Sequence, residues 1–164
     1  MLPAISLLLV AALSRFIPHP FNFTAVGAMA LFAGANFKDK RIAYLMPVTI
    51  MLLTDLILGL HTSMIPVYGC FAFTVFLGTQ INGKANFLRV GTASILSSVI
   101  FFLVTNLPLW YLDKGLYPMT WTGTMESYTM AIPFFNHQVL GDLFYNAVLF
   151  GSYSLYLSAR RVKA

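Results

Sequence analysis

The chain has 164 residues, of which 59% are hydrophobic and only 9% are charged, and its mean hydropathy is +0.78. Soluble domains carry about 25% charged residues, so this chain has too little polar surface to cover itself in water. The composition therefore excludes a soluble globular domain. It predicts an all-α, polytopic membrane helical bundle that forms one integral membrane domain over residues 1–164.

Six apolar segments follow one another along the chain, and each is a candidate helix. The expected bounds are near 2–17, 21–37, 42–60, 64–81, 90–107 and 133–158. A membrane-spanning helix needs roughly 20 residues, so the first two helices are expected to tilt or to extend by snorkelling ends. Pro18 and Pro20 separate these two helices, and Pro133 is expected in the first turn of the last one.

The net charge of +5 is concentrated after the second, fourth and sixth segments. Eight of the ten basic side chains lie there, namely Lys38, Lys40, Arg41, Lys84, Arg89, Arg160, Arg161 and Lys163. Basic loops stay on the cytoplasmic side of a membrane, so six crossings place both termini in the cytoplasm. The connection at 108–132 then lies outside. Its Trp110, Tyr117 and Trp121 are expected at the membrane interface, as an anchor or as a lid.

The stretch RFIPHPFNFT, which begins at Arg15, places polar side chains between two apolar helices. Arg15 either snorkels to the outer interface or pairs with Asp55 or Asp142 inside the bundle. The prolines hold the turn rigid, so His19 and Asn22 are expected to face a cavity at a low ordering cost. The same charges therefore fit either structural ion pairs or a substrate cavity.

The last helix carries a polar face. Gln138, Asp142 and Asn146 recur every four residues and share one side of the helix, with His137 beside it. Hydrogen bonding between helices and lining of a cavity explain this face about equally well. A similar face on the fifth helix is interpreted as helix packing, and it consists of Ser94, Ser98 and Thr105.

The second helix is rich in small residues, and its Ala30 and Gly34 form a small-xxx-small pair. Such pairs let helix backbones approach closely. The pattern therefore predicts close contact with another helix, either within this subunit or in a partner.

Sequence motifs for catalysis or for cofactor binding are absent. The chain has no HExxH, GxSxG or phosphate-binding loop pattern, so no enzyme activity is expected. Cys70 is the only cysteine, so an intramolecular disulfide or a CxxC site cannot form. His19, His61 and His137 are scattered over separate connections, and no metal or other cofactor is expected.

Short motifs are spread over nearly the whole chain. The pattern R-x-x-PHP-x-NFT starts at Arg15, and F-x-G-x-x-F starts at Phe32. The further motifs are TDLILG (54–59), NLPLW (106–110), YPMTWTG (117–123) and PFFNHQVLGDLFYNAVLFG (133–151). Together they resemble a family of small bacterial integral membrane proteins of unassigned function, which implies a multi-pass protein of the inner (cytoplasmic) membrane. Ala25 departs from this resemblance, which implies Pro after NFT.

In architecture the expected bundle is similar to the S-components of energy-coupling-factor transporters. These are small six-helix proteins that bind a vitamin or a metal through outer loops and associate with an ATPase-driven module. The resemblance implies a vitamin-like ligand and a transport module as partner. It also implies an AxxxA docking pattern on the first helix, which here reads Ala4, Leu8, Ala12 and lacks the middle alanine.

The preferred hypothesis is a bilayer-embedded subunit that binds a small molecule for uptake and does not bind nucleic acid. Its expected substrate-binding residues are Arg15, His19, Asn22, Asp55, His137, Gln138, Asp142 and Asn146. The alternative is a non-catalytic structural or accessory subunit of a larger membrane complex. An intramembrane enzyme that uses Asp142 and His137 ranks last, because side chains five residues apart on a helix diverge by about 140°.

Overall fold

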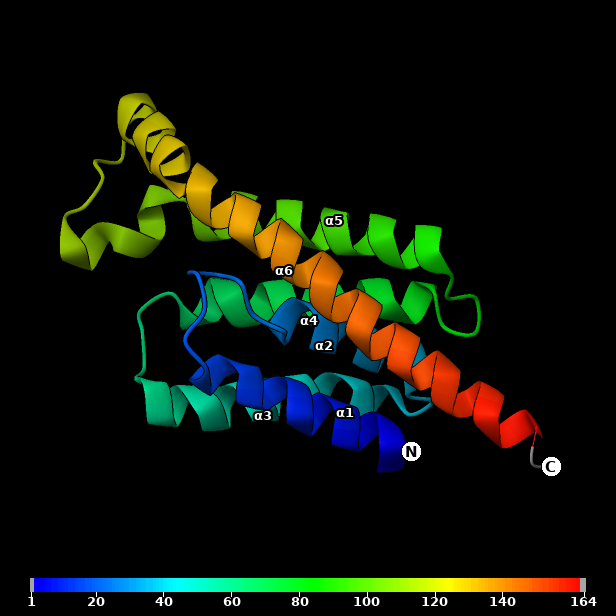
Figure 1. Ribbon diagram of the computed structural model, residues 1–164. Helices are drawn as coiled ribbons and strands as arrows, with labels where there is room; N and C mark the ends of the chain where they lie inside the picture. The colour runs from blue at the N-terminus through cyan, green and yellow to red at the C-terminus, as the bar shows by residue number, and fades with distance from the viewer. Residues whose placement is uncertain (1, 163–164) are drawn as a thin grey trace.

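The computed structural model describes residues 2–162 without the side chains at 112 and 113, and Lys163 of the last basic cluster lies outside this range. Within it the chain forms six α-helices, two 3-10 helices and no strand (Figure 1). In chain order these are α1 (Leu2–Leu13), η1 (Ser14–Phe16), α2 (Val26–Asn36), α3 (Lys40–Leu58), α4 (Met64–Gln80), α5 (Phe87–Thr105), η2 (Pro108–Lys114) and α6 (Trp121–Val162). The prediction of an all-helical chain is confirmed.

The connections between the helices gather at two ends of the bundle (Figure 1). One end, called the distal end below, holds the connections 17–25, 59–63 and 106–120. The opposite end, called the terminal end, holds the connections 37–39 and 81–86 together with both ends of the described chain. Because the basic clusters flank these latter segments, the positive charge of the described residues is concentrated at the terminal end.

Helix α2 is the centre of the bundle and contacts each of the other five α-helices. All ten residues from Val26 to Ala35 are buried, and most of their side chains are small. Small side chains let the surrounding backbones approach closely. Large side chains fill the gaps around them, as where the Phe32 ring packs edge-on against the rings of Phe150 and Tyr153.

The closest approach in the bundle is the crossing of α2 and α4. A Cβ atom added to Gly34 would lie 2.1 Å from the Val75 carbonyl oxygen, and one added to Gly78 would lie 2.3 Å from the Leu31 carbonyl oxygen. Ala30 is fully buried one turn before Gly34. The small-residue pair of α2 therefore lies against a helix of the same subunit.

Two helices, α3 and α5, are long and apolar enough to cross a membrane by length and composition. The shorter apolar helices among the described residues are Leu2–Phe16, Val26–Asn36 and Met64–Gln80. These lengths indicate membrane association only weakly, since a buried core helix of a soluble protein can be equally long and apolar.

The first two helices are shorter than the sequence predicts. α1 ends at Leu13 and continues only as the 3-10 turn η1, and α2 begins at Val26 rather than near residue 21. The intervening chain turns at Asn22, whose φ of 63° lies in the left-handed region. Asn tolerates this conformation better than most residues, but a helix cannot continue through it.

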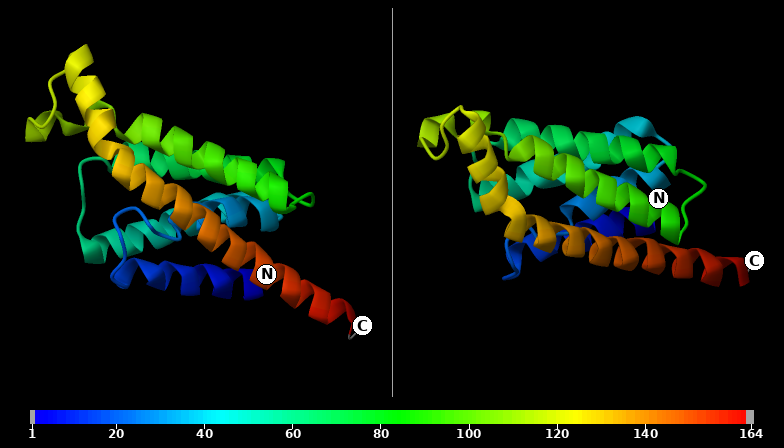
Figure 2. Two further views of the ribbon diagram at one scale, coloured as in Figure 1. Left: turned by 45° about the horizontal axis from the view of Figure 1, so that its top comes forward. Right: turned by 90° about the horizontal axis from the view of Figure 1, so that it is seen from above.

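The last helix begins at Trp121 rather than near Pro133, so the expected loop at 108–132 is replaced by η2, a short connection and the first turns of α6. Thr120 starts the helix, because its hydroxyl oxygen accepts a hydrogen bond from the Gly123 N–H at 3.1 Å. Pro133 lies inside the helix. The right-hand view of Figure 2 shows a bend where α6 passes from yellow to orange, close to this proline, as expected where a backbone donor is missing.

We predict that Gly34→Ala destabilises the protein by about 1–3 kcal/mol, because the new methyl group forces α2 away from α4. Gly69→Ala is the matched control, since Gly69 lies in α4 with nothing within 4 Å of an added Cβ. This control should raise stability by about 0.5–1 kcal/mol through helix propensity. Thermal unfolding of the purified variants measures both effects, and equal stability of the two variants would contradict the close crossing.

Candidate functional site

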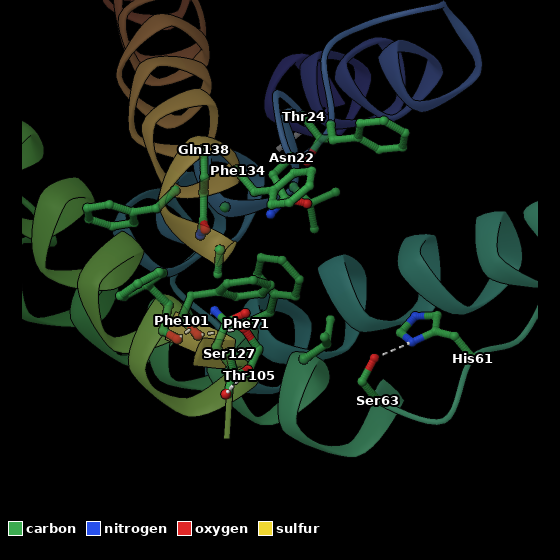
Figure 3. A pocket seen from close by; sticks show the side chains of 18 of the residues that line it. Asn22, Thr24, His61, Ser63, Phe71, Phe101, Thr105, Ser127, Phe134 and Gln138 are labelled. Carbon is green, nitrogen blue, oxygen red and sulfur yellow. Dashed lines mark hydrogen bonds between the residues drawn. The ribbon is translucent and has the colours of Figure 1, made fainter. Parts of the chain in front are cut away.

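A cavity of about 540 Å³ lies at the distal end of the bundle (Figure 3). Figure 1 shows that α2 begins well inside the bundle, short of the distal ends of α3, α4 and α5. The central position beyond α2 is therefore left without a helix. Thr24, Val26 and Gly27 at the start of α2 form one side of the cavity. The short central helix thus creates the space that the longer helices enclose.

Aromatic side chains form most of the apolar wall. Two contacts join helices across it: Phe71 of α4 to Phe101 of α5, with ring centroids 5.4 Å apart, and Phe102 to Phe135 of α6, at 4.7 Å. Eight aromatic residues line the cavity, namely Phe21, Phe71, Phe101, Phe102, Tyr111, Tyr117, Phe134 and Phe135. The lining also contains polar side chains such as Asn22, Gln138 and Asp142, and apolar walls with polar groups between them are typical of small-molecule sites.

Asp142 is the acidic residue among the described side chains of the cavity lining, and it is only 4% exposed. Its Oδ2 accepts a hydrogen bond of 2.8 Å from the Ser98 hydroxyl of α5. Its Oδ1 would lie 2.2 Å from a Cβ added to Gly27, so the carboxylate rests on the first turn of α2. A carboxylate at a helix N-terminus is favoured by the helix dipole. Glycine at 27 is what allows this approach.

The polar face of α6 divides between the cavity and the contact with α5. Gln138 is 8% exposed, lines the cavity, and extends toward it from α6 in Figure 3. Asn146 is buried one turn beyond Asp142, where its amide donates to the Ser94 hydroxyl oxygen at 3.0 Å. Ser94, Ser98 and Asn146 therefore hold α5 to α6, whereas Gln138 and Asp142 face the cavity.

Arg15 pairs with Asp55, which is one of the two carboxylates considered as its partner. The Arg15 Nη2 lies 2.7 Å from Asp55 Oδ1, and the Tyr68 hydroxyl donates to Asp55 Oδ2 at 2.7 Å. Arg15 Nη1 also donates to the Thr54 hydroxyl and to the Met51 carbonyl oxygen. This network fastens η1 and α4 to the distal part of α3. Arg15 lines the cavity, but Asp55 behind it neutralises its charge.

The structure brings half of the expected substrate-binding residues to one cavity. Arg15, Asn22, Gln138 and Asp142 line it. The other four residues do not line it. Asp55 is paired with Arg15, and Asn146 lies one helical turn past Asp142, against α5. His19 faces its own turn, and His137 projects from another side of α6. His19 Nδ1 lies 2.9 Å from the Pro20 carbonyl oxygen, and the buried Nδ1 of His137 has no partner among the described residues.

Of the three aromatic residues expected at the outer connection, only Tyr117 lines the cavity. Its ring packs edge-on against Tyr111, with centroids 5.9 Å apart. Trp110 instead donates its Nε1–H to the Val104 carbonyl oxygen at 2.7 Å, which fixes η2 to the end of α5. Trp121 is 77% exposed at the start of α6.

Several lining residues carry no distinctive sequence signal. His61 at the rim is exposed and bonds Ser63 through its Nδ1 at 3.0 Å (Figure 3). Burial raises the pKa of the Tyr111 phenol, and nearby Tyr117 adds to this shift. Tyr111 therefore stays protonated at neutral pH and donates to the Thr105 carbonyl oxygen at 3.0 Å. In an apolar sequence, a phenylalanine that faces a cavity has the same neighbours in sequence as one that faces outward. Which phenylalanines line the cavity could therefore not be predicted from the sequence.

One comparison with known proteins identifies the chain's family. Residues 1–164 match the model of a family of unknown function, DUF6580. The chain belongs to this family. No curated protein and no solved structure matches the chain. Membership of DUF6580 therefore agrees with the expectation of an uncharacterised family and assigns no activity, so the function has to be argued from the cavity.

We predict that Asp55→Asn lowers the free energy of unfolding by roughly 3 kcal/mol, because it leaves the largely buried Arg15 without its counter-ion. Tyr68→Phe removes only one hydrogen bond to the same carboxylate and should cost about 1.5 kcal/mol. Thermal unfolding of the two variants against the wild type gives the order. An Asp55→Asn variant as stable as the wild type would show that the pair does not hold η1 to α3.

Proposed function

We propose that this protein is a subunit of the bacterial inner membrane that binds a small, vitamin-like molecule in its distal cavity for uptake. The observation that carries the proposal is the cavity itself, at about 540 Å³. Ligand sites of about 300–1,000 Å³ are typical for small molecules. The proposal includes no catalytic step and no cofactor.

The outer surface of the bundle supports the membrane part of the proposal. Large apolar side chains are exposed on most helices, for example Val10, Leu53, Ile57, Leu103 and Phe144. The interior, in contrast, is rich in alanine, glycine, serine and threonine. Large residues outside and small residues at helix contacts are typical of bundles that face lipid. We infer six crossings, with the basic terminal end in the cytoplasm.

The lengths of two helices fit this arrangement in different ways. α2 has 11 residues and rises only about 17 Å. We therefore propose that it crosses only part of the bilayer and that the cavity occupies the remaining depth beyond its start. α6 has 42 residues and rises about 63 Å, so its ends extend beyond a hydrocarbon core of about 30 Å.

The resemblance to S-components of energy-coupling-factor transporters supports the proposal, because those proteins are also small six-helix bundles that bind a ligand at their outer end. Docking through the first helix is not part of it. Ala4, Leu8 and Ala12 are all buried in the core of this subunit, so they are not available to a transport module. A module would have to bind another face.

The alternative function is a structural or accessory subunit of a larger membrane complex. Two observations favour it: the extensive apolar exterior, and the Arg15–Asp55 pair, which stabilises the subunit without any ligand. A cavity of this size with a buried carboxylate in its lining is not needed for that role, and this favours the binding function.

We predict that native mass spectrometry of protein purified gently in mild detergent reveals a small-molecule adduct. Two variants should remove the adduct: Ala131→Phe, which fills the cavity, and Gln138→Leu, which removes a polar lining group of similar size. His19→Ala is the control, because His19 is not part of the lining.

The outcome separates the two functions. An adduct that all three variants retain equally would place the ligand outside the cavity. Absence of any adduct, together with a stoichiometric set of other membrane chains, would favour the accessory subunit.

We also predict opposite accessibility of the two ends in intact cells. In a Cys70→Ala background, Lys114→Cys at the distal end should react with a membrane-impermeant maleimide. Lys84→Cys at the terminal end should react only after the cells are permeabilised. Both positions are exposed, so burial does not confound the comparison. Equal labelling of both in intact cells would contradict the six-crossing arrangement.

A further inference from the structure

Asp142 has no cationic partner among the residues that the structure describes. Both ion pairs within 4.0 Å in this part of the chain involve Asp55, with Arg15 at 2.7 Å and His61 at 4.0 Å. Asp142 is 96% buried and receives one hydroxyl hydrogen bond, from Ser98. A buried carboxylate is usually paired or coordinates a cation. Asp142 therefore differs from the other buried carboxylate in lacking a counter-ion.

Burial disfavours the ionised form of Asp142, whereas hydrogen bonds from the Ser98 and Gln138 side chains favour it. The first turn of α2, on which the carboxylate rests at Gly27, also favours the ionised form. None of these groups supplies a positive charge. Because Asp142 lines the cavity, a cation that enters it would meet the carboxylate directly.

The aromatic walls of the cavity also favour a cation. The face of an aromatic ring is electron-rich and attracts cations, and this attraction grows when water is excluded. Eight aromatic residues line the cavity, and rings from α4, α5 and α6 are among them. Arg15 is the one arginine or lysine among the described lining residues, and Asp55 already balances its charge. His61 is exposed, and Figure 3 shows it well apart from Gln138.

We propose that the cavity binds a small organic cation, with the positive group close to Asp142 and the apolar part between the aromatic walls. This inference rests on the proposed function, because it names the chemical class of the ligand for the same cavity. An anionic ligand would meet an uncompensated carboxylate. A neutral ligand would leave Asp142 buried without a counter-ion, a state that the carboxyl group could relieve only by taking up a proton.

Three probes of nearly equal shape test this inference on the full-length protein in detergent. They are benzyltrimethylammonium, its neutral carbon isostere neopentylbenzene, and the anion phenylmethanesulfonate. A ligand that binds the folded state raises the thermal unfolding midpoint by an amount that grows with the ratio of the free ligand concentration to its Kd. We expect the ammonium probe to bind the wild type about tenfold or more tightly than the neutral isostere, and the sulfonate not to bind.

Two carboxylate-to-amide variants localise the effect. Asp142→Asn should abolish the preference for the ammonium probe over neopentylbenzene. Glu126→Gln is the matched control and should keep it, because Glu126 is an exposed carboxylate near the distal end that does not line the cavity.

Three results would overturn the inference: equal binding of the ammonium and neutral probes, tighter binding of the sulfonate, or no stabilisation of the wild type by any probe. The comparison of probes on the wild type needs no variant, so it decides the question even where Asp142→Asn does not fold. If the charge preference fails while native mass spectrometry still finds a cavity-dependent adduct, the binding function stands without it. If the adduct is also missing, both fail.

Discussion

The fold depends on a central helix that is both short and made of small residues. Because α2 offers almost no side-chain bulk, five helices pack around it, and α4 approaches so closely that Gly34 and Gly78 face each other's helix backbone. Because α2 also begins only at Val26, the same helices enclose a space that none of them fills. Close packing in one half of the bundle and a cavity in the other half thus follow from one element.

The two buried carboxylates have different surroundings, and the difference follows from their positions. Asp55 lies on α3, where the turn after η1 brings Arg15 within 2.7 Å, so its charge is used to join chain segments. Asp142 lies on α6 above the start of α2, where a hydroxyl and a helix end contact it but no basic side chain of the described residues does. The first carboxylate is structural, and the second is the basis for our ligand proposal.

Local patterns predicted the helices and the polar face of α6, because both depend on residues close in sequence. They did not decide which carboxylate pairs with Arg15, since Asp55 is 40 positions away and Asp142 is farther. The start of α6 was missed because Pro133 resembles a first-turn proline, whereas Thr120 caps the helix and the helix bends to accommodate the proline. The left-handed backbone at Asn22, which shortens α2, could not be predicted from the spacing of apolar residues in the sequence.

Helix α6 connects the two ends of the molecule with a single stretch of backbone. From Pro133 to Val162 it has no further proline, and it passes the cavity at Gln138 and Asp142 before it reaches Arg160 and Arg161. At 1.5 Å per residue, the basic end lies about 30 Å along the helix from the cavity wall. Contacts with α5 at Asn146 and with α2 at Phe150 and Tyr153 fix the helix along this path, so the cavity wall and the basic end belong to one rigidly supported element.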